Sequence, residues 1–455
     1  MTRWILSLAM LSALPLGAQQ DKCLDAANES QKKWTAAGPH SWLDDVWHNE
    51  AVEIARTWCY VWETHGMDRL DKGIDFGRAF FTGDGWHPVV GGIVPGSGFA
   101  GGLGMQLERN TAAPALRYSG SVEARGSYNG FWVAGGVLDI TRADNDPDNR
   151  HIHAVIEARE YELPQLTYFG LGNASLLANE SLYGLQATTA GAHVDFPLPG
   201  GVSLIAGVGG LVADPAPAHG SLPSIEQKFT AADTPGLTTG TGYVVPGAGI
   251  KWRYPEAETM WGYSTSLAAS FRAFHEASGL PYSFRRIDFT WQNVFRPYVR
   301  VKPAAAKAGP PRKVGLGAVS ATFRLAESWG PAGNNVPFYL QPTIGGTDID
   351  NIDVVRSYRD YRFRAPNAMA FQAEYERSIK GPIGLLGFYD VGKVGMARGD
   401  LDFTHMRHSF GAGIVVTAGN LPVLKFYYAW GGHEGTHTTY TLNTNNFAGT
   451  ASGVF

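Results

Sequence analysis

Hydrophobic and polar residues alternate along much of the chain from residue 86 onward. In four segments, 153–159, 266–273, 318–325 and 371–376, apolar residues recur at every second position among small, polar or charged ones. Successive side chains of a β-strand point to opposite faces, so each segment predicts a strand with one apolar face. In the last segment Phe371, Ala373 and Tyr375 share one face, and Gln372, Glu374 and Glu376 share the other.

The residues opposite the apolar faces distinguish between two β architectures. A soluble β-sandwich also alternates, because it packs two apolar faces against each other. Here a continuous apolar face stands opposite a small, polar or charged face, which is typical of a barrel with lipid outside and a wet interior. A span of about 360 residues divides into about sixteen strands at about 22 residues per strand with its connection. We therefore predict an all-β fold, a transmembrane antiparallel β-barrel of about 16 strands over residues 79–455.

The first 18 residues have the pattern of a signal peptide. Arg3 precedes the apolar run 4–16, and the small residues Gly17 and Ala18 follow it. The alternative is a short buried helix. No other uninterrupted apolar run reaches the roughly 18 residues that a membrane-spanning helix needs. An exported chain of this kind is either an outer-membrane barrel or a soluble periplasmic or secreted β-protein.

Residues 19–78 differ from the rest of the chain. In segment 41–65 apolar residues recur at spacings of three and four, which predicts helix, and Ser41 is a candidate N-cap. We expect a short helical periplasmic segment ahead of the barrel. Cys23 and Cys59, the two cysteines of the chain, both lie in it. In an oxidising compartment such a pair predicts a disulfide, with two buried free thiols as the alternative.

Composition agrees with many strands, tight turns and aromatic girdles. The chain has 57 glycines, 23 phenylalanines, 19 tyrosines and 13 tryptophans, and 17% of its residues are charged. The net charge of −4 offers no broad basic surface, so we expect no nucleic-acid partner. The mean hydropathy of −0.14 is low for a bundle of membrane helices. Alternation in a barrel hides the lipid-facing side from such an average.

Motifs for catalysis or cofactor binding are not found in the sequence. There is no G-x-S-x-G nucleophile elbow, and Ser97 in "VPGSGF" has the wrong spacing. The glycine-rich segment 91–104 is not followed by the Gly-Lys-Ser/Thr of a phosphate-binding loop. His151 and His153 alternate on a predicted strand, and an exposed pair of this kind rarely binds a metal. We assign no catalytic residue, no metal ligand and no cofactor, and expect no enzyme.

One segment, 344–394, carries the most specific pattern. A glycine turn leads to Val355-Arg356-Ser357-Tyr358, and two strands follow, carrying Glu374 and Asp390. It resembles the lid loop and following strands of the BamA/TamA-type outer-membrane family, the bacterial surface-antigen barrels. Where this chain has Val355-Arg356-Ser357-Tyr358, that family has Val/Leu-Arg-Gly-Phe/Tyr, so Ser357 replaces a glycine. Glu374-Tyr375 is similar to the Glu-Tyr-Arg strand of the family, with Glu376 in place of the arginine. Residues 388–392 are similar to its Phe-x-Asp-x-Gly strand.

Further segments resemble other parts of the same family in the same order. They are 86–104 (first strands), 168–175 (a Phe-x-Gly-x-Gly-Asn loop), 336–346 (the approach to the lid loop) and 410–435 (the last strands). The resemblance covers about residues 86–447. The periplasmic POTRA modules of many relatives, with a strand–helix–helix–strand–strand pattern, are not visible in 19–78.

The resemblance implies a role for three charged residues. In the family the lid-loop arginine lies inside the barrel and pairs with carboxylates of the following strands, which here are Glu374 and Asp390. A guanidinium fork makes directional, charge-assisted bonds to carboxylates, so Arg356 would act as a structural latch of the loop. The alternative is three surface charges that never meet.

The resemblance also implies a function and a location. The family inserts or translocates proteins at the bacterial outer membrane, so the expected partners are outer-membrane lipid and client outer-membrane or secreted proteins. The N-terminal segment would be periplasmic. The alternative is a passive pore or a structural surface antigen without assembly activity.

Overall fold

A computed structural model describes a large part of the chain. The described residues are 29, 32, 85–111, 115–142, 151–218, 220–254, 262–301, 312–315, 317–380, 383–418, 421–431, 434 and 436–442. The chain forms two compact units, Met1–Gly77 and Arg78–Phe455, and every described strand belongs to the second. The predicted signal peptide and the Cys23–Cys59 disulfide lie outside the described residues. So does the predicted helical segment, except Glu29 and Lys32, which are helical.

Sixteen strands form one antiparallel sheet, in which each strand pairs with its neighbours in the strand order and the end strands β1 and β20 pair with one neighbour each. They are β1 (Gly85–Gly91), β2 (Ala100–Asn110), β3 (Leu116–Ser127), β4 (Trp132–Arg142), β5 (His153–Tyr168), β6 (Ser181–Leu198), β7 (Val202–Pro217), β8 (Thr241–Tyr254), β9 (Tyr263–Glu276), β10 (Phe284–Phe295), β13 (Ala318–Trp329), β16 (Asn367–Lys380), β17 (Ile383–Gly395), β18 (Arg407–Ala418), β19 (Leu421–Trp430) and β20 (Thr436–Leu442).

Two small hairpin sheets and four short 3₁₀ turns complete the described elements. β11 (Tyr298–Val301) pairs with β12 (Arg312–Gly315), and β14 (Thr343–Ile344) pairs with β15 (Phe363–Arg364). The turns are η1 (Leu177–Asn179), η2 (Ile225–Gln227), η3 (Phe338–Leu340) and η4 (Arg398–Asp400). Among the described residues, no helix combines the length and the apolar character that crossing a membrane requires.

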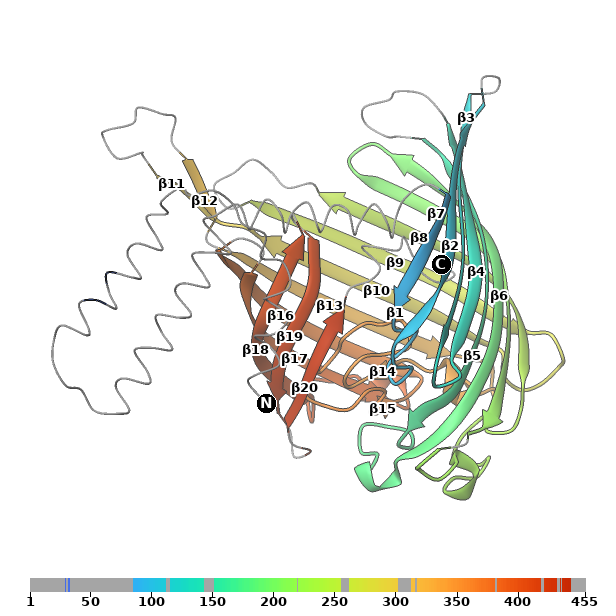
Figure 1. Cartoon of the computed structure of the whole chain (residues 1–455). Coiled ribbons are helices and arrows are strands. Elements are labelled where there is room, and N and C mark those ends of the chain that lie inside the picture. Colours follow the sequence, from blue (N-terminus) through green and yellow to red (C-terminus); the bar gives the residue numbers. More distant parts are fainter. Residues whose placement is uncertain are drawn as a thin grey trace, which may run out of the picture. The chain divides into compact units, whose positions relative to one another are not determined.

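The sheet curls, and β14 and β15 lie within the curl (Figure 1). The predictions of an all-β antiparallel fold and of about sixteen strands are confirmed. Among the described strands no pairing joins β1 to β20, the two ends of the strand order. Closure of the sheet into a barrel therefore stays a prediction.

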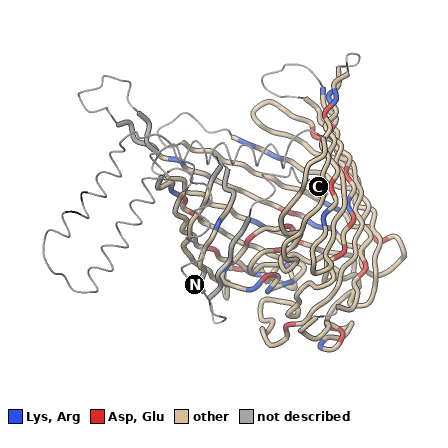
Figure 2. The backbone as a smooth tube through the Cα atoms, viewed as in Figure 1, with Lys and Arg blue, Asp and Glu red and all other residues tan. Residues whose placement is uncertain are grey.

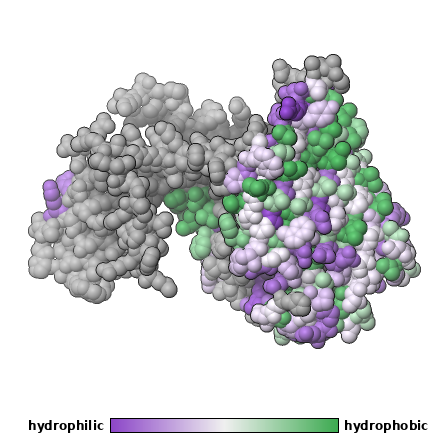
Figure 3. All heavy atoms as spheres, turned by 45° about the vertical axis from the view of Figure 1, so that its right-hand side comes forward, coloured by the Kyte–Doolittle hydropathy of each residue, from purple (hydrophilic) through white to green (hydrophobic). Residues whose placement is uncertain are grey.

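The outward face of the sheet is apolar. On β7 the residues Leu204, Val208 and Val212 are 43%, 51% and 52% exposed, although they are large and hydrophobic. The same spacing exposes Ile287, Trp291 and Phe295 on β10, and Phe371, Tyr375 and Ile379 on β16. Figure 3 shows the resulting apolar patches along the visible outer face of the strands. The predicted alternation is confirmed, and it leaves a row of large apolar side chains facing away from the protein.

Charged residues of both signs are distributed along the strands (Figure 2), and some of those on the face opposite the apolar one form ion pairs. Arg125 pairs with Glu123 of the same strand at 3.2 Å, and Arg272 of β9 pairs with Asp288 of β10 at 2.5 Å. The alternation therefore separates an apolar outer surface from a polar interior, as the sequence predicts for residues 266–273.

Aromatic rings fill one region of the interior. The Phe338 ring of η3 lies 5.3 Å from the Tyr168 ring and 4.8 Å from the Tyr183 ring, in edge-to-face contacts. All three side chains are at most 1% exposed. Aromatic pairs in this geometry stabilise beyond the area that they bury, so they fix η3, which leads into β14, against β5 and β6.

Candidate functional site

The lid loop, residues 345–362, connects β14 to β15 and is held closed at its base by their pairing. Its ends come too close together for most side chains. A Cβ added at Gly345 (φ +102°) would lie 2.5 Å from the Arg362 Cβ, and one at Gly346 (φ +59°) would lie 2.6 Å from the Asp360 nitrogen. The glycine turn in the sequence thus marks a position where only glycine combines the left-handed conformation with the close approach.

Arg356 meets both carboxylates that the resemblance assigns to it. Its Nε and Nη2 donate to the two oxygens of Asp390 at 2.9 and 2.8 Å, and its Nη1 donates to Glu374 at 2.6 Å. The backbone N–H of Arg356 also donates to Asp390, at 3.1 Å. Arg356 is 4% exposed and Asp390 is fully buried. The arrangement is a two-pronged, charge-assisted contact with a third bond to a neighbouring strand.

The sheet register brings the two carboxylates together. Asp390 of β17 stands opposite Gln372 of β16, and Glu374 is the next residue on the same face of β16. Diagonal neighbours on one face of an antiparallel pair lie about 7–8 Å apart, within reach of one guanidinium between them. Gln372 contributes as well, because its side-chain amide donates to the Asp353 carbonyl of the lid loop at 2.6 Å.

Aromatic rings enclose the guanidinium. The Arg356 Cζ lies 3.5 Å from the centre of the Phe388 ring and 5.6 Å from that of Tyr427. A Cβ at Gly411 would come within 2.4 Å of the Phe388 ring, so this glycine leaves the space that the ring occupies. A cation over an aromatic face is attracted to it, more strongly where water is excluded.

The protonation state of Arg356 follows from these contacts. Burial by itself would lower the pKa of the guanidinium. The hydrogen bonds and negative charge of Asp390, with the charge of Glu374, outweigh burial and raise the pKa above its ordinary value. Arg356 is therefore charged at neutral pH, as its pairing with two carboxylates requires.

A lysine that the sequence reasoning missed shares Glu374 with Arg356. Lys425 of β19 donates to Glu374 at 2.7 Å and lies 2.7 Å from Glu376. Glu376 stands where the resembled family has an arginine, and here it pairs with this lysine from the neighbouring region of the sheet. Alternation along "LKFYYAW" puts Lys425 and Tyr427 on one face, which is the signal that could have identified it.

The remaining motif residues, Val355, Ser357 and Tyr358, are all buried. The Ser357 N–H donates to the Ser409 hydroxyl at 2.8 Å, and the Tyr358 ring lies 5.2 Å from the Phe363 ring. The left-handed conformation of the motif falls on Val355, at φ +53°. It does not fall on Ser357, so serine is accommodated where the family has glycine. A β-branched residue at positive φ is strained, and the surrounding contacts must hold it there.

A second arginine anchors the end of the lid loop. Arg362 is 1% exposed and donates to Glu434, between β19 and β20, at 2.7 Å. It also donates to the Ser175 hydroxyl at 2.9 Å and to the Ser175 carbonyl at 2.8 Å. Sequence reasoning missed this anchor, although "YRDYRFR" places three arginines close together directly after the motif.

The lid loop contacts other segments that the sequence singled out. Directly after the loop, the Arg364 carbonyl of β15 accepts a hydrogen bond from the Gly172 N–H of segment 168–175 at 2.7 Å. The Asn351 side chain donates to the Ile93 carbonyl of segment 86–104 at 3.1 Å. Segments far apart in the sequence therefore meet around one loop. Among the described residues, no group of three or more His, Cys, Asp or Glu side chains is placed to hold a metal ion.

Comparisons with known proteins give structural neighbours only. No family model matches the sequence, and no curated protein matches it. The chain is similar in structure to BamA from Haemophilus ducreyi lacking POTRA domains 1–3, at 13% identity and a TM-score of 0.48, over 78% of this chain and 68% of that one.

Two further neighbours are CdiB proteins. CdiB from Acinetobacter baumannii is 11% identical with a TM-score of 0.42, over 76% of this chain and 55% of that one. CdiB from Escherichia coli is 11% identical with a TM-score of 0.41, over 78% and 61%. The chain thus spans less than two thirds of the length of either CdiB. BamA is also named in the family that the motifs resemble, but at these identities and TM-scores the likeness assigns no function.

Proposed function

We propose that this chain is an outer-membrane β-barrel that inserts or translocates proteins at the bacterial outer membrane. The observation that carries the proposal is the lid loop inside an amphipathic sheet, tied to its wall by Arg356, Asp390 and Glu374. These residues stand at the motif positions of the BamA/TamA-type resemblance. The proposal includes export by residues 1–18, a periplasmic segment 19–78 and a role without catalysis.

The outer face of the sheet supports a place in lipid. Its large apolar side chains would be unfavourable in water, and they follow strands such as β5 and β6, which contain 16 and 18 residues. A tilted transmembrane strand needs about 9–11 residues, so these strands suffice to cross. Unpaired backbone groups are costly in hydrocarbon, so we infer that the ends of the sheet meet in the membrane.

The end strands support a role in handling client chains. β1 and β20 are the two ends of the strand order, and among the described strands each of them pairs on one side only. A free strand edge offers N–H and C=O groups to an added strand, which is the chemistry that a client β-strand needs.

The test is client folding in liposomes. The full chain is reconstituted, an unfolded outer-membrane β-barrel is added, and its folding is followed by the gel shift between unheated and heated samples. We expect faster folding than in empty liposomes, and loss of that acceleration in Arg356→Ala. Arg117→Ala is the matched control, because Arg117 lies in an exposed ion pair with Glu108.

The alternative, a passive pore or structural antigen, gives a different outcome. If the client folds no faster than in empty liposomes and the chain conducts steadily in planar bilayers, the protein is a passive pore and the proposal is wrong. No acceleration and no conductance would leave the structural antigen.

A further inference from the structure

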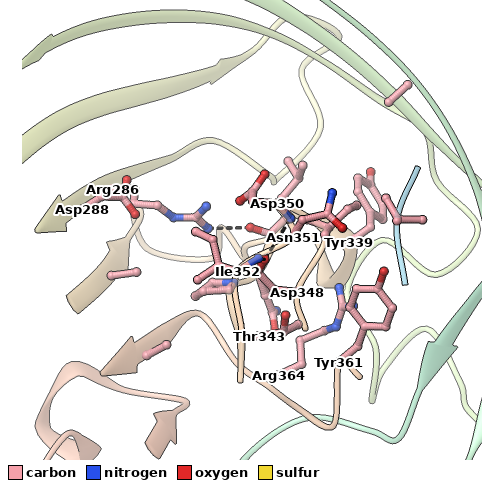
Figure 4. Close-up of a pocket in the computed structure, with 18 of the residues that line it drawn as sticks. Arg286, Asp288, Tyr339, Thr343, Asp348, Asp350, Asn351, Ile352, Tyr361 and Arg364 are labelled. Carbon is pink, nitrogen blue, oxygen red and sulfur yellow. Dashed lines mark hydrogen bonds between the residues drawn. The ribbon is translucent and has the colours of Figure 1, made fainter. Parts of the chain in front are cut away.

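A cavity of about 710 Å³ lies between the tip of the lid loop and the inward faces of several strands. Binding sites for small molecules usually measure about 300–1,000 Å³. Figure 4 shows residues of the loop tip, Asp348, Asp350 and Ile352, between Arg286 on one side and Arg364 with Tyr361 on the other. The lid loop therefore leaves open space around its tip in the interior of the sheet.

The lining of this cavity is strongly basic. Six arginines line it, one each from β3, β5, β9, β10, β13 and β15: Arg125, Arg159, Arg272, Arg286, Arg324 and Arg364. Three aspartates line it as well, Asp288, Asp348 and Asp350, and no lysine or glutamate does. The described lining therefore carries twice as many arginines as aspartates, so its net charge is positive whether or not the aspartates are ionised.

Two of the arginines are nearly buried and bind only neutral oxygens. Arg286, 9% exposed, donates to the Ser328 hydroxyl at 2.9 Å and to the Leu340 carbonyl at 2.6 Å. Arg364, 3% exposed, donates to the Phe338 carbonyl at 2.7 Å and to the Tyr183 hydroxyl at 3.1 Å. A buried charge is costly unless an opposite charge compensates it, and these contacts supply none.

Donor capacity on the arginines is also unused. In the part of the chain that the structure describes, the buried Nε atoms of Arg272, Arg324 and Arg364 have no hydrogen-bond partner. Guanidinium groups at such positions can donate to a multiply charged anion, and phosphate accepts from several of them at once.

The loop-tip carboxylates stand near these arginines without pairing to them. One oxygen of Asp348 accepts from the backbone N–H groups of Asp350 at 3.0 Å and Ile352 at 2.8 Å. Among the described residues, neither aspartate lies within ion-pair distance of an arginine. The two loop-tip carboxylates thus leave the guanidinium groups of Arg286 and Arg324 open to a ligand, while Arg272 is paired on one side with Asp288.

We propose that this cavity binds a small soluble molecule bearing phosphate groups, held by Arg286, Arg324 and Arg272. The site is separate from the Arg356 contact, and it does not rest on the proposed function. A soluble ligand fits better than a lipid headgroup, because the lining consists of inward-facing residues on the side of the sheet opposite its apolar outer face.

The probe is inorganic pyrophosphate, titrated calorimetrically into the full chain in an uncharged detergent. We expect saturable binding that Arg324→Gln weakens about tenfold or more, the value of one lost charge-assisted bond. Arg117→Gln, outside the cavity, should bind as the unaltered chain does, and retained gel-shift behaviour of each variant shows that it is folded.

Several results would overturn the proposal. They are the absence of saturable binding of pyrophosphate, equal affinity in Arg324→Gln, or the same weakening in Arg117→Gln. A short-chain phosphatidic acid presents phosphate on a lipid. If it binds and pyrophosphate does not, the ligand is a headgroup and the assignment to a soluble molecule is wrong.

Discussion

Arg356 shows why a guanidinium rather than an ammonium suits the lid loop. Three of its nitrogens reach two carboxylates on two strands, while its planar face lies on the Phe388 ring. A lysine has a single charged nitrogen, so it cannot make the two-pronged contact to both oxygens of Asp390 and reach Glu374 as well. The strain at Val355 lies directly beside this contact, at φ +53°, so the bonds of Arg356 help to hold an unfavourable backbone conformation.

Replacing Arg356 with alanine should release the loop and leave the sheet intact. Removing one partner of a buried ion pair costs about 3–5 kcal/mol. The full burial of Asp390 favours this range over the smaller cost of an exposed pair. Limited proteolysis with mass mapping should show new cleavage within residues 345–362, while the gel shift on heating persists. Arg356→Lys should restore protection only in part, and unchanged protection in Arg356→Ala would refute the latch.

The folded position of the loop tip should become less stable as pH rises. Burial, and then the charge of Asp350, raise the pKa of Asp348, against the opposing effects of two backbone N–H groups and Arg324. A carboxyl whose folded pKa is raised favours the folded form at low pH, and that advantage is lost as pH rises from about 4 through the raised pKa. Cleavage within 345–362, normalised to an unfolded substrate, should increase with pH over this window. Asp348→Asn should flatten the increase, and an unaltered pH profile in this variant would contradict the assignment.

At the scale of elements, β18 makes room for the ring under Arg356. A Cβ at Gly411 would meet both the Phe388 ring at 2.4 Å and the Tyr428 carbonyl at 2.5 Å. On β17, a Cβ at Gly387 would meet nothing within 4 Å. The two glycines thus differ in their surroundings, although the sequence presents both as glycines within strands.

Gly411→Ala should therefore destabilise the protein and Gly387→Ala should not. Overpacking a filled site costs about 1–3 kcal/mol. The temperature at which the gel shift is lost should fall in Gly411→Ala, and protease sensitivity of the lid loop should rise with it. Equal effects of the two substitutions would show that the space next to Phe388 is not filled as described.

Sequence patterns predicted the strands better than the contacts between distant segments. Alternation in 266–273 and 371–376 indicates which residues face outward, since a strand has one period and two faces. The Arg362–Glu434 contact joins residues 72 apart, and it depends on the path of the loop and the turn after β19. The periodicity of neighbouring residues carries no information about the path of a loop, so it could not predict this contact. Arg356, Glu374 and Asp390 could be identified only because a family resemblance linked their motifs.

At the scale of the whole molecule, the apolar outer face and the charged interior divide the sheet into two environments. Large exposed residues such as Trp291 and Phe426, 45% and 50% exposed, lie on different strands of the same surface. A soluble protein rarely leaves such a surface uncovered, because extended apolar patches drive association. Lipid is the solvent that suits it, and the polar interior then needs no burial in hydrocarbon.

The most direct test of this account is the location and gel behaviour of the full chain in a Gram-negative host. Membranes are separated by density, washed with urea, and the chain is run on a denaturing gel with and without heating. We predict that the chain stays in the outer-membrane fraction after washing and migrates differently before and after heating, as a folded barrel does. Recovery of the folded chain from the soluble periplasm without detergent would contradict the account.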